Sequence, residues 1–134
     1  MTSFKWLFLF TAILCFASAC FSGPVVVPEN ATTAEITQMG QIAMDKDRDN
    51  QAIQYFEVIR ERFPENQEAV CGADYQIAFI HYKQKKYSIA KEEFNALLAQ
   101  YNKPEGRALP QKYRILSTIV LKKIAEKQKI LAEE

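Results

Sequence analysis

Apolar residues return every three or four positions along most of this chain, from about residue 32 onward. Ile53, Phe56, Ile59 and Phe63 show the spacing most clearly. It places apolar side chains on one face of an α-helix, and no strand-like alternation competes with it. The pattern therefore predicts an all-α fold, with helices at 32–45, 49–63, 67–84, 88–101 and 109–131.

The helical part of the sequence also resembles itself at a fixed spacing. A shift of 38 residues places Gly40 on Ala78, Ile42 on Ile80, Ala52 on Ala90, Phe56 on Phe94, Ile59 on Leu97 and Phe63 on Tyr101. A further shift places Tyr75 on Tyr113 and Ile77 on Ile115. Such similarity is typical of stacked helical hairpins. We predict two hairpins and the first helix of a third, whose segment 110–131 covers the open end.

Small residues occur where the two helices of each hairpin must approach closely, and an aromatic residue follows one turn later. Together with a proline after the first hairpin, these positions resemble the signature of the tetratricopeptide repeat family. The resemblance implies repeat-packing roles for Gly40, Ala52, Phe56, Pro64, Ala78, Ala90 and Phe94. The period is longer than the family's usual value of about 34 residues, and the extra residues follow Pro64.

Tetratricopeptide proteins bind polypeptide segments in a groove lined by the first helix of each hairpin. By this resemblance the groove residues are Thr37, Gln41, Met44, Tyr75, Phe79, Tyr82 and Lys83. Aromatic side chains beside a lysine are suitable anchors for a peptide. Alternatively, Phe79 and Tyr82 pack against the helix of the third repeat, and the two interpretations do not exclude each other.

The beginning of the chain differs from the rest. Lys5 is the only charged residue before Glu29, and residues 6–16 form an unbroken, mostly bulky apolar run. Eleven residues at about 1.5 Å each cover only about half of a bilayer core of about 30 Å. We therefore expect residues 1–19 to be a signal peptide that is removed.

Ala17, Ser18 and Ala19 precede Cys20 in an arrangement that resembles a bacterial lipobox. The resemblance implies cleavage between Ala19 and Cys20, a diacylglycerol on the thiol and a further acyl chain such as palmitate on the new N-terminus. Ordinary secretory cleavage after an A-x-A motif is the alternative. Residues 20–31, with two prolines and a glycine, are expected to form an extended tether, and residues 32–134 the repeat domain.

Few residues suggest chemistry. The formal net charge of +1 gives no electrostatic case for nucleic-acid binding. The chain has no glycine-rich phosphate loop and no CxxC, HExxH or GxSxG motif, so we expect neither enzyme activity nor a cofactor or metal. Residues 45–49 superficially resemble a calcium loop but are interpreted as an inter-helix turn. His81 and Cys71 are interpreted as packing residues, with an envelope enzyme that uses His81 as the alternative.

The ends of the second helices, VIRERFP and ALLAQY, resemble a narrower family over residues 14–101. The family that they resemble is the BamD family (ComL/YfiO type) of outer-membrane assembly lipoproteins. The resemblance implies a scaffold at the periplasmic face of the outer membrane, held by lipid on Cys20. Its partners would be a BamA-type barrel and unfolded outer-membrane proteins. The alternative is a different repeat lipoprotein that scaffolds cell-wall or secretion components.

Overall fold

The computed structural model describes residues 23–133, where all regular structure is helical. The elements are α1 (Thr33–Asp45), α2 (Asp49–Arg62), α3 (Gln67–Lys83), α4 (Tyr87–Tyr101), the short 3₁₀ helix η1 (Pro104–Ala108) and α5 (Gln111–Glu133). This confirms the all-α prediction, and the expected α-helix limits are correct to within two residues. The sequence did not predict η1, which begins at Pro104.

The predicted signal peptide, its cleavage point and the lipidation site at Cys20 lie outside the described residues. Within residues 23–133, no helix combines the length and the apolar character needed to cross a membrane.

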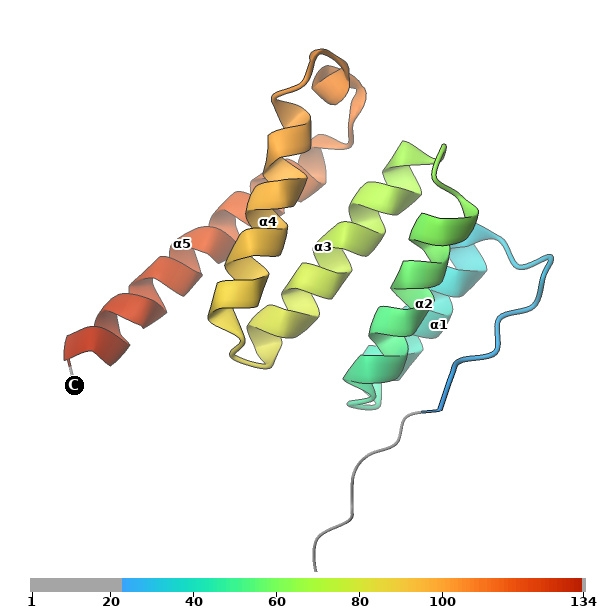
Figure 1. Ribbon diagram of the computed structural model, residues 1–134, viewed down its shortest axis with the longest axis horizontal. Helices are drawn as coiled ribbons and strands as arrows, with labels where there is room; N and C mark the ends of the chain where they lie inside the picture. Colours follow the sequence, from blue (N-terminus) through green and yellow to red (C-terminus); the bar gives the residue numbers. More distant parts are fainter. Residues whose placement is uncertain (1–22, 134) are drawn as a thin grey trace, which may run out of the picture.

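The helices pack in sequence order as antiparallel neighbours, α1 with α2, α3 with α4, and α5 beside α4 (Figure 1). Two hydrophobic clusters hold them together. The first joins the α1–α2 hairpin to one face of α3, through Ile36, Ala43, Ala52, Phe56, Ile59, Ala73, Ile77 and Ile80. The second joins α3, α4 and α5, through Cys71, Tyr75, Ala78, Ala90, Phe94, Leu97, Tyr101, Val120 and Ile124. Helix α3 therefore contributes to both clusters and links the hairpins.

The two hairpins repeat in their backbone geometry as well as in sequence. Asp47 in the α1–α2 turn has φ 54° and Lys85 in the α3–α4 turn has φ 60°, and these positions are 38 residues apart. Both residues have a left-handed backbone conformation, which ends one helix and turns the chain toward the next. Residues 45–49 therefore form the inter-helix turn that the sequence analysis favoured.

The small residues lie where the helices of each hairpin come closest. Ala52, Ala78 and Ala90 are fully buried. A methyl group on Gly40 would lie 2.6 Å from Cζ of Phe56, so only a glycine fits beside this ring. Pro64 follows the end of α2 and is exposed. The packing of the first hairpin thus depends on the absence of a side chain at residue 40.

Helix α5 departs from the predicted third repeat in one respect. Ile77 is 5% exposed, whereas Ile115, aligned with it by the 38-residue period, is 60% exposed. Helix α5 instead buries Ser117, Val120 and Ile124. The alignment of Ile115 with Ile77 is therefore wrong as a guide to burial, although α5 does cover the open end as expected.

The described part of the predicted tether, residues 23–31, is bound to the domain. We call this segment the strap. The guanidinium of Arg62 donates hydrogen bonds to the carbonyls of Pro28 (2.9 Å) and Val27 (3.3 Å), and the N–H of Val25 donates to Oε1 of Gln54 (3.1 Å). The strap has no helix or strand, as predicted, and α2 holds it at residues 25, 27 and 28.

Candidate peptide-binding groove

The inner groove is a cavity of about 370 Å³ on the face formed by the first helix of each repeat. Helices α1, α3 and α5 all contribute to its wall. It is lined by Thr33, Ala34, Thr37, Gln38, Gln41, Asn66, Glu68, Ala69, Gly72, Gln76 and Tyr113. The stacking of the repeats therefore creates a site that no single hairpin could form.

Most residues that line the inner groove are uncharged and carry polar side chains. Gln38, Gln41 and Gln76 bring three side-chain amides to it from two helices, and Gln38 and Gln41 are exposed. A primary amide both donates and accepts hydrogen bonds, as a peptide group does. This composition suits an extended polypeptide backbone better than a charged or purely apolar ligand.

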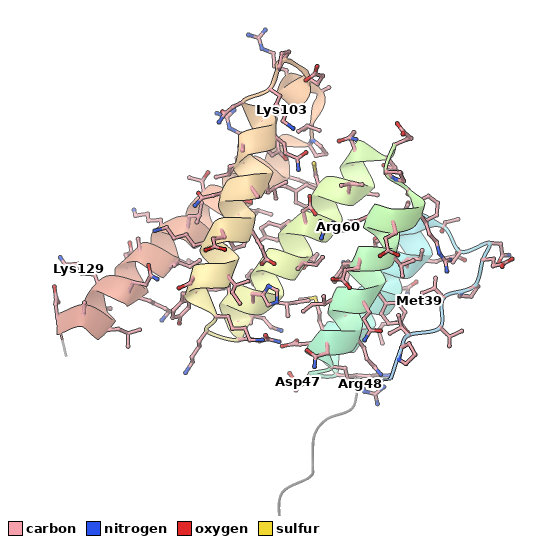
Figure 2. All side chains as sticks on the ribbon, viewed as in Figure 1. Met39, Asp47, Arg48, Arg60, Lys103 and Lys129 are labelled. Carbon is pink, nitrogen blue, oxygen red and sulfur yellow. The ribbon has the colours of Figure 1, made fainter. Side chains whose placement is uncertain are left out.

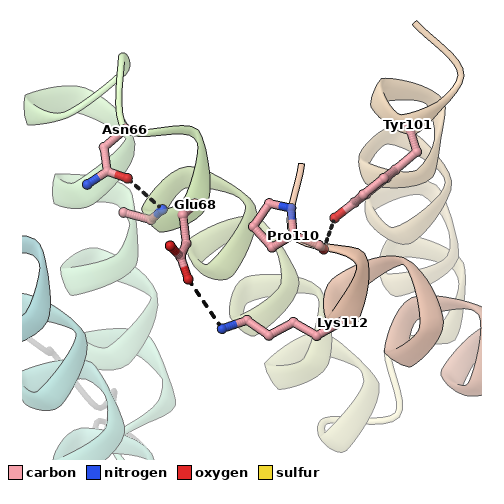
Figure 3. A network of polar contacts seen from close by, with 6 residues as sticks. Asn66, Glu68, Tyr101, Pro110 and Lys112 are labelled. Atoms are coloured by element: carbon pink, nitrogen blue, oxygen red, sulfur yellow. Dashed lines mark hydrogen bonds and ion pairs between the residues drawn. The ribbon is translucent and has the colours of Figure 1, made fainter. Parts of the chain in front are cut away.

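The end of the groove at α5 is held by a network of polar contacts (Figure 3). Lys112 of α5 pairs with Glu68 of α3 at 3.6 Å, and its ammonium lies 4.8 Å from the centre of the Tyr113 ring. A methyl group on Gly72 would lie 2.7 Å from the Tyr113 hydroxyl, so this glycine lets the tyrosine lie close across α3. The Tyr113 side chain therefore forms the wall of the groove on its α5 side.

The start of α5 is fixed by a buried tyrosine. The hydroxyl of Tyr101 donates a 2.8 Å hydrogen bond to the carbonyl of Pro110 (Figure 3). Burial is the main cause that raises the pKa of Tyr101 to about 12. The phenol therefore stays protonated at neutral pH and keeps its hydrogen to donate.

Two of the seven predicted groove residues, Thr37 and Gln41, line the inner groove. Met44 is half-buried against the first hydrophobic cluster, and Lys83 is exposed at the last residue of α3. These two side chains do not contribute to this cavity.

The predicted aromatic anchors instead form a packed row. Tyr75 is 9% exposed, and its ring centre lies 5.9 Å from that of Phe79 and 5.7 Å from that of Tyr113. Phe79 and Tyr82 are half-buried against the second cluster, which contains residues of α5. Phe79 also lies 5.9 Å from Tyr82, and Tyr82 lies 6.0 Å from Tyr87 of α4, measured between ring centres, so these rings pack within the second cluster.

The resemblance to tetratricopeptide repeats did not point to Gln38, Gln76, Asn66 or Tyr113 as groove residues. One signal was present, because Gln38 and Gln76 are separated by the 38-residue period and so occupy equivalent positions on α1 and α3. The part played by Tyr113 depends on the rotation of α5, which the repeat pattern did not predict.

The opposite face, formed mainly by α2, α3 and α4, carries polar contacts between helices. Nε of Arg60 lies 3.1 Å from Oδ1 of Asp74, and Nδ1 of His81 lies 2.7 Å from Oε2 of Glu93. Burial raises the pKa of Asp74, an effect that Arg60 opposes and Glu93 reinforces. His81 is half-buried and thus joins α3 to α4 at the boundary of the core.

Cys71 is fully buried in the second cluster, and burial raises the pKa of its thiol above the usual range. Among residues 23–133, no group of three histidine, cysteine or carboxylate side chains is arranged to hold a metal ion.

Comparison with known proteins gives one informative match. An uncharacterized protein of Treponema pallidum (strain Nichols) is 32% identical over 111 residues, which is 81% of this chain and 44% of that protein. The chain therefore spans less than half the length of this relative. No protein-family model and no solved structure matches the chain.

Proposed function

We propose that this protein is a lipid-anchored scaffold of the bacterial envelope that binds an extended segment of a partner protein in the inner groove. The observation that carries the proposal is the set of amides from α1 and α3 around a cavity of about 370 Å³. These amides pair with the partner's peptide groups, so recognition depends on backbone hydrogen bonds more than on charge. The protein acts by holding its partner, with no chemical step.

Within this proposal, the role that the sequence supports best is in a BamD-like assembly machine for outer-membrane β-barrels. The lipobox-like residues before Cys20 and the 38-residue helical repeats support it together, because a BamD-type scaffold combines a lipid anchor with such repeats. The protein would sit at the periplasmic face of the outer membrane and bind a BamA-type barrel or unfolded barrel proteins.

The experiment is affinity capture of the tagged full-length protein from its own cells in mild detergent, with Cys20→Ala as the anchoring control. We expect mass spectrometry to find acyl chains on residue 20 and an outer-membrane barrel protein with periplasmic domains among the partners. Acylation with cell-wall or secretion proteins instead would replace the assembly role with that of a different envelope scaffold. An unmodified Cys20 would remove the anchor from the proposal.

Binding in the groove is tested by comparing a double variant of groove residues with a control variant on the opposite face. Gln41→Ala with Gln76→Ala removes two amides from the inner groove, whereas Gln100→Ala removes one from the opposite face. At about 1 kcal/mol for each lost hydrogen bond, the double variant should bind its captured partner roughly 30-fold more weakly. Equal partner recovery from the double variant and from Gln100→Ala would refute binding in this groove.

A further inference from the structure

The strap fixes the direction in which the chain leaves the domain. Arg62, at the C-terminal end of α2, holds the carbonyls of Val27 and Pro28. Gln54, eight residues earlier on the same helix, holds the N–H of Val25. The strap therefore lies along α2, and the described chain begins beside the α1–α2 turn, where Figure 2 labels Asp47 and Arg48.

This geometry limits how far a lipid on Cys20 can lie from the domain. Gly23 lies three positions after Cys20, and an extended chain spans at most about 3.6 Å per position, or about 11 Å in all. If Cys20 carries the anchor, as the proposed function requires, the α1–α2 turn must stay close to the bilayer surface.

The α1–α2 turn belongs to one edge of the molecule, which we call the turn end. It comprises residues 45–49, residues 83–86 at the α3–α4 turn, and the C-terminal part of α5, residues 122–133; Figure 1 shows these segments along its lower edge. They contain nine basic and five acidic residues. The opposite edge, residues 29–35, 61–68 and 102–114, contains five basic and six acidic residues. Positive charge is thus concentrated at the turn end.

Exposed apolar side chains gather at the same end. Eight large apolar side chains are exposed in the described chain, and four of them lie in or next to the segments of the turn end: Ile42 in the last turn of α1, Ile89 in the first turn of α4, and Ile130 and Leu131 in α5. Their exposed fractions run from 45% to 61%. Of the other four, Val26 lies in the strap beside α2, and Ile115, Leu116 and Ile119 lie nearer the start of α5.

A basic surface that also presents apolar side chains is the combination that binds a bilayer interface. Lysine and arginine attract anionic headgroups, while isoleucine and leucine enter the boundary with the acyl chains. An anchor attached beside that surface adds to both effects, because it holds the surface at a high local concentration of lipid.

We propose that the turn end is a membrane-contacting face, which docks on a phospholipid bilayer containing anionic headgroups. The proposal rests on the anchoring of Cys20 within the proposed function. Helices α1 to α4 then stand upright on the bilayer, and the inner groove opens to the side, parallel to the membrane surface. A partner polypeptide would thus lie along the membrane while it is held.

The test measures which end of the domain touches lipid. The only tryptophan of the chain is Trp6, in the predicted signal peptide, so the mature chain has none. Single variants Ile89→Trp and Leu131→Trp place a fluorophore at the turn end, and Ile115→Trp is the matched control at another exposed position. The mature chain is coupled through Cys20 to a maleimide phospholipid in vesicles of phosphatidylglycerol and brominated phosphatidylcholine. Cys71 does not interfere because it is fully buried.

We expect bromine to quench Ile89→Trp and Leu131→Trp several-fold more strongly than Ile115→Trp. Equal quenching at all three positions, or the strongest quenching in Ile115→Trp, would overturn the proposal. Because the coupling is chemical, this result does not depend on acylation in cells. The mass of residue 20 in the natural protein tests the anchor separately, so failure of the anchor and failure of the orientation can be told apart.

A second comparison tests the strap. Gln54→Ala combined with Arg62→Ala removes the three hydrogen bonds that hold the strap, while Arg107→Ala makes a matched change at the opposite edge. The double change should reduce the difference in quenching between Ile89→Trp and Ile115→Trp, and Arg107→Ala should preserve it. An undiminished difference in the double variant would refute the role of the strap in orientation.

Discussion

The first hairpin depends on a glycine whose replacement should be costly. Gly40 is buried in α1, and a methyl group there would lie 2.6, 2.9 and 3.0 Å from three atoms of the Phe56 ring. Phe56 is 1% exposed and belongs to the first hydrophobic cluster, so the ring has little room to retreat. Gly40→Ala therefore forces either the Phe56 ring to move or the two helices to separate.

Two effects of opposite sign set the magnitude. Overpacking a core by one methyl group costs about 1–3 kcal/mol. Alanine in place of glycine stabilises a helix by about 0.5–1 kcal/mol. The net loss of unfolding free energy should be about 1–2 kcal/mol, which for a domain of this size lowers Tm by roughly 5–15 °C.

The assay is urea unfolding of the mature chain, followed by circular dichroism, with Phe56→Leu and the double variant completing a mutant cycle. Leucine is smaller than phenylalanine and makes room for the new methyl group, so the double variant should lose less stability than the sum of the single losses. A coupling of about 1 kcal/mol is expected for residues in direct contact. A Gly40→Ala protein as stable as the parent, or strictly additive changes, would refute the close-packing argument.

Four further predictions concern single residues. The hydroxyl of Ser117 is buried without a hydrogen-bond partner, so Ser117→Ala should stabilise by about 1 kcal/mol in urea unfolding; a loss of stability would contradict this. Lys85 has φ 60°, a conformation that costs an L-residue about 1–2 kcal/mol, so Lys85→Gly should raise Tm, and a lower Tm would count against the strain. The Cys71 thiol is buried with a raised pKa, so an aromatic disulfide reagent should modify it only as urea unfolds the chain; rapid modification of the folded protein would disprove its burial. Burial raises the pKa of Asp74. The stability that this shift contributes is fully present below the unfolded pKa of about 3.9. It is lost as the pH rises through the pKa that Asp74 has in the folded state. Asp74→Asn should therefore gain stability relative to the parent between pH 3 and pH 7, and a difference independent of pH would refute this.

The repeat fold could be predicted because it follows from local patterns. Apolar spacing fixed the positions of the helices, and the match of Gly40 with Ala78 and of Phe56 with Phe94 fixed the hairpin repeat. The left-handed residues Asp47 and Lys85 then occur at the same 38-residue separation. Each of these features depends on neighbours that are close along the chain or related by the period.

Features that depend on how the last helix rotates could not be predicted in the same way. The period aligned Ile115 with Ile77, which is buried, yet α5 turns Ser117, Val120 and Ile124 inward instead. This rotation brings Tyr113 against Tyr75 and to the end of the inner groove. The predicted anchors Phe79 and Tyr82 pack against the second hydrophobic cluster.

The strap shows a second limit of sequence reasoning. Its prolines and its lack of periodicity correctly indicated a segment without helix or strand, but they carried no information about long-range partners. The partners of the strap are Gln54 and Arg62, which lie 29 to 35 residues away. The sequence does not indicate whether an arginine or glutamine at the surface binds a backbone group or water.

The central claim, that the inner groove holds a partner polypeptide, is tested most directly by site-specific photocrosslinking in living cells. A photoreactive amino acid is placed at Gln76 in the groove or, as the matched control, at Gln100 on the opposite face. We predict that position 76 crosslinks to an outer-membrane barrel protein through a discrete segment and that position 100 does not. Crosslinks of equal yield from both positions, or none from position 76, would contradict the proposed function.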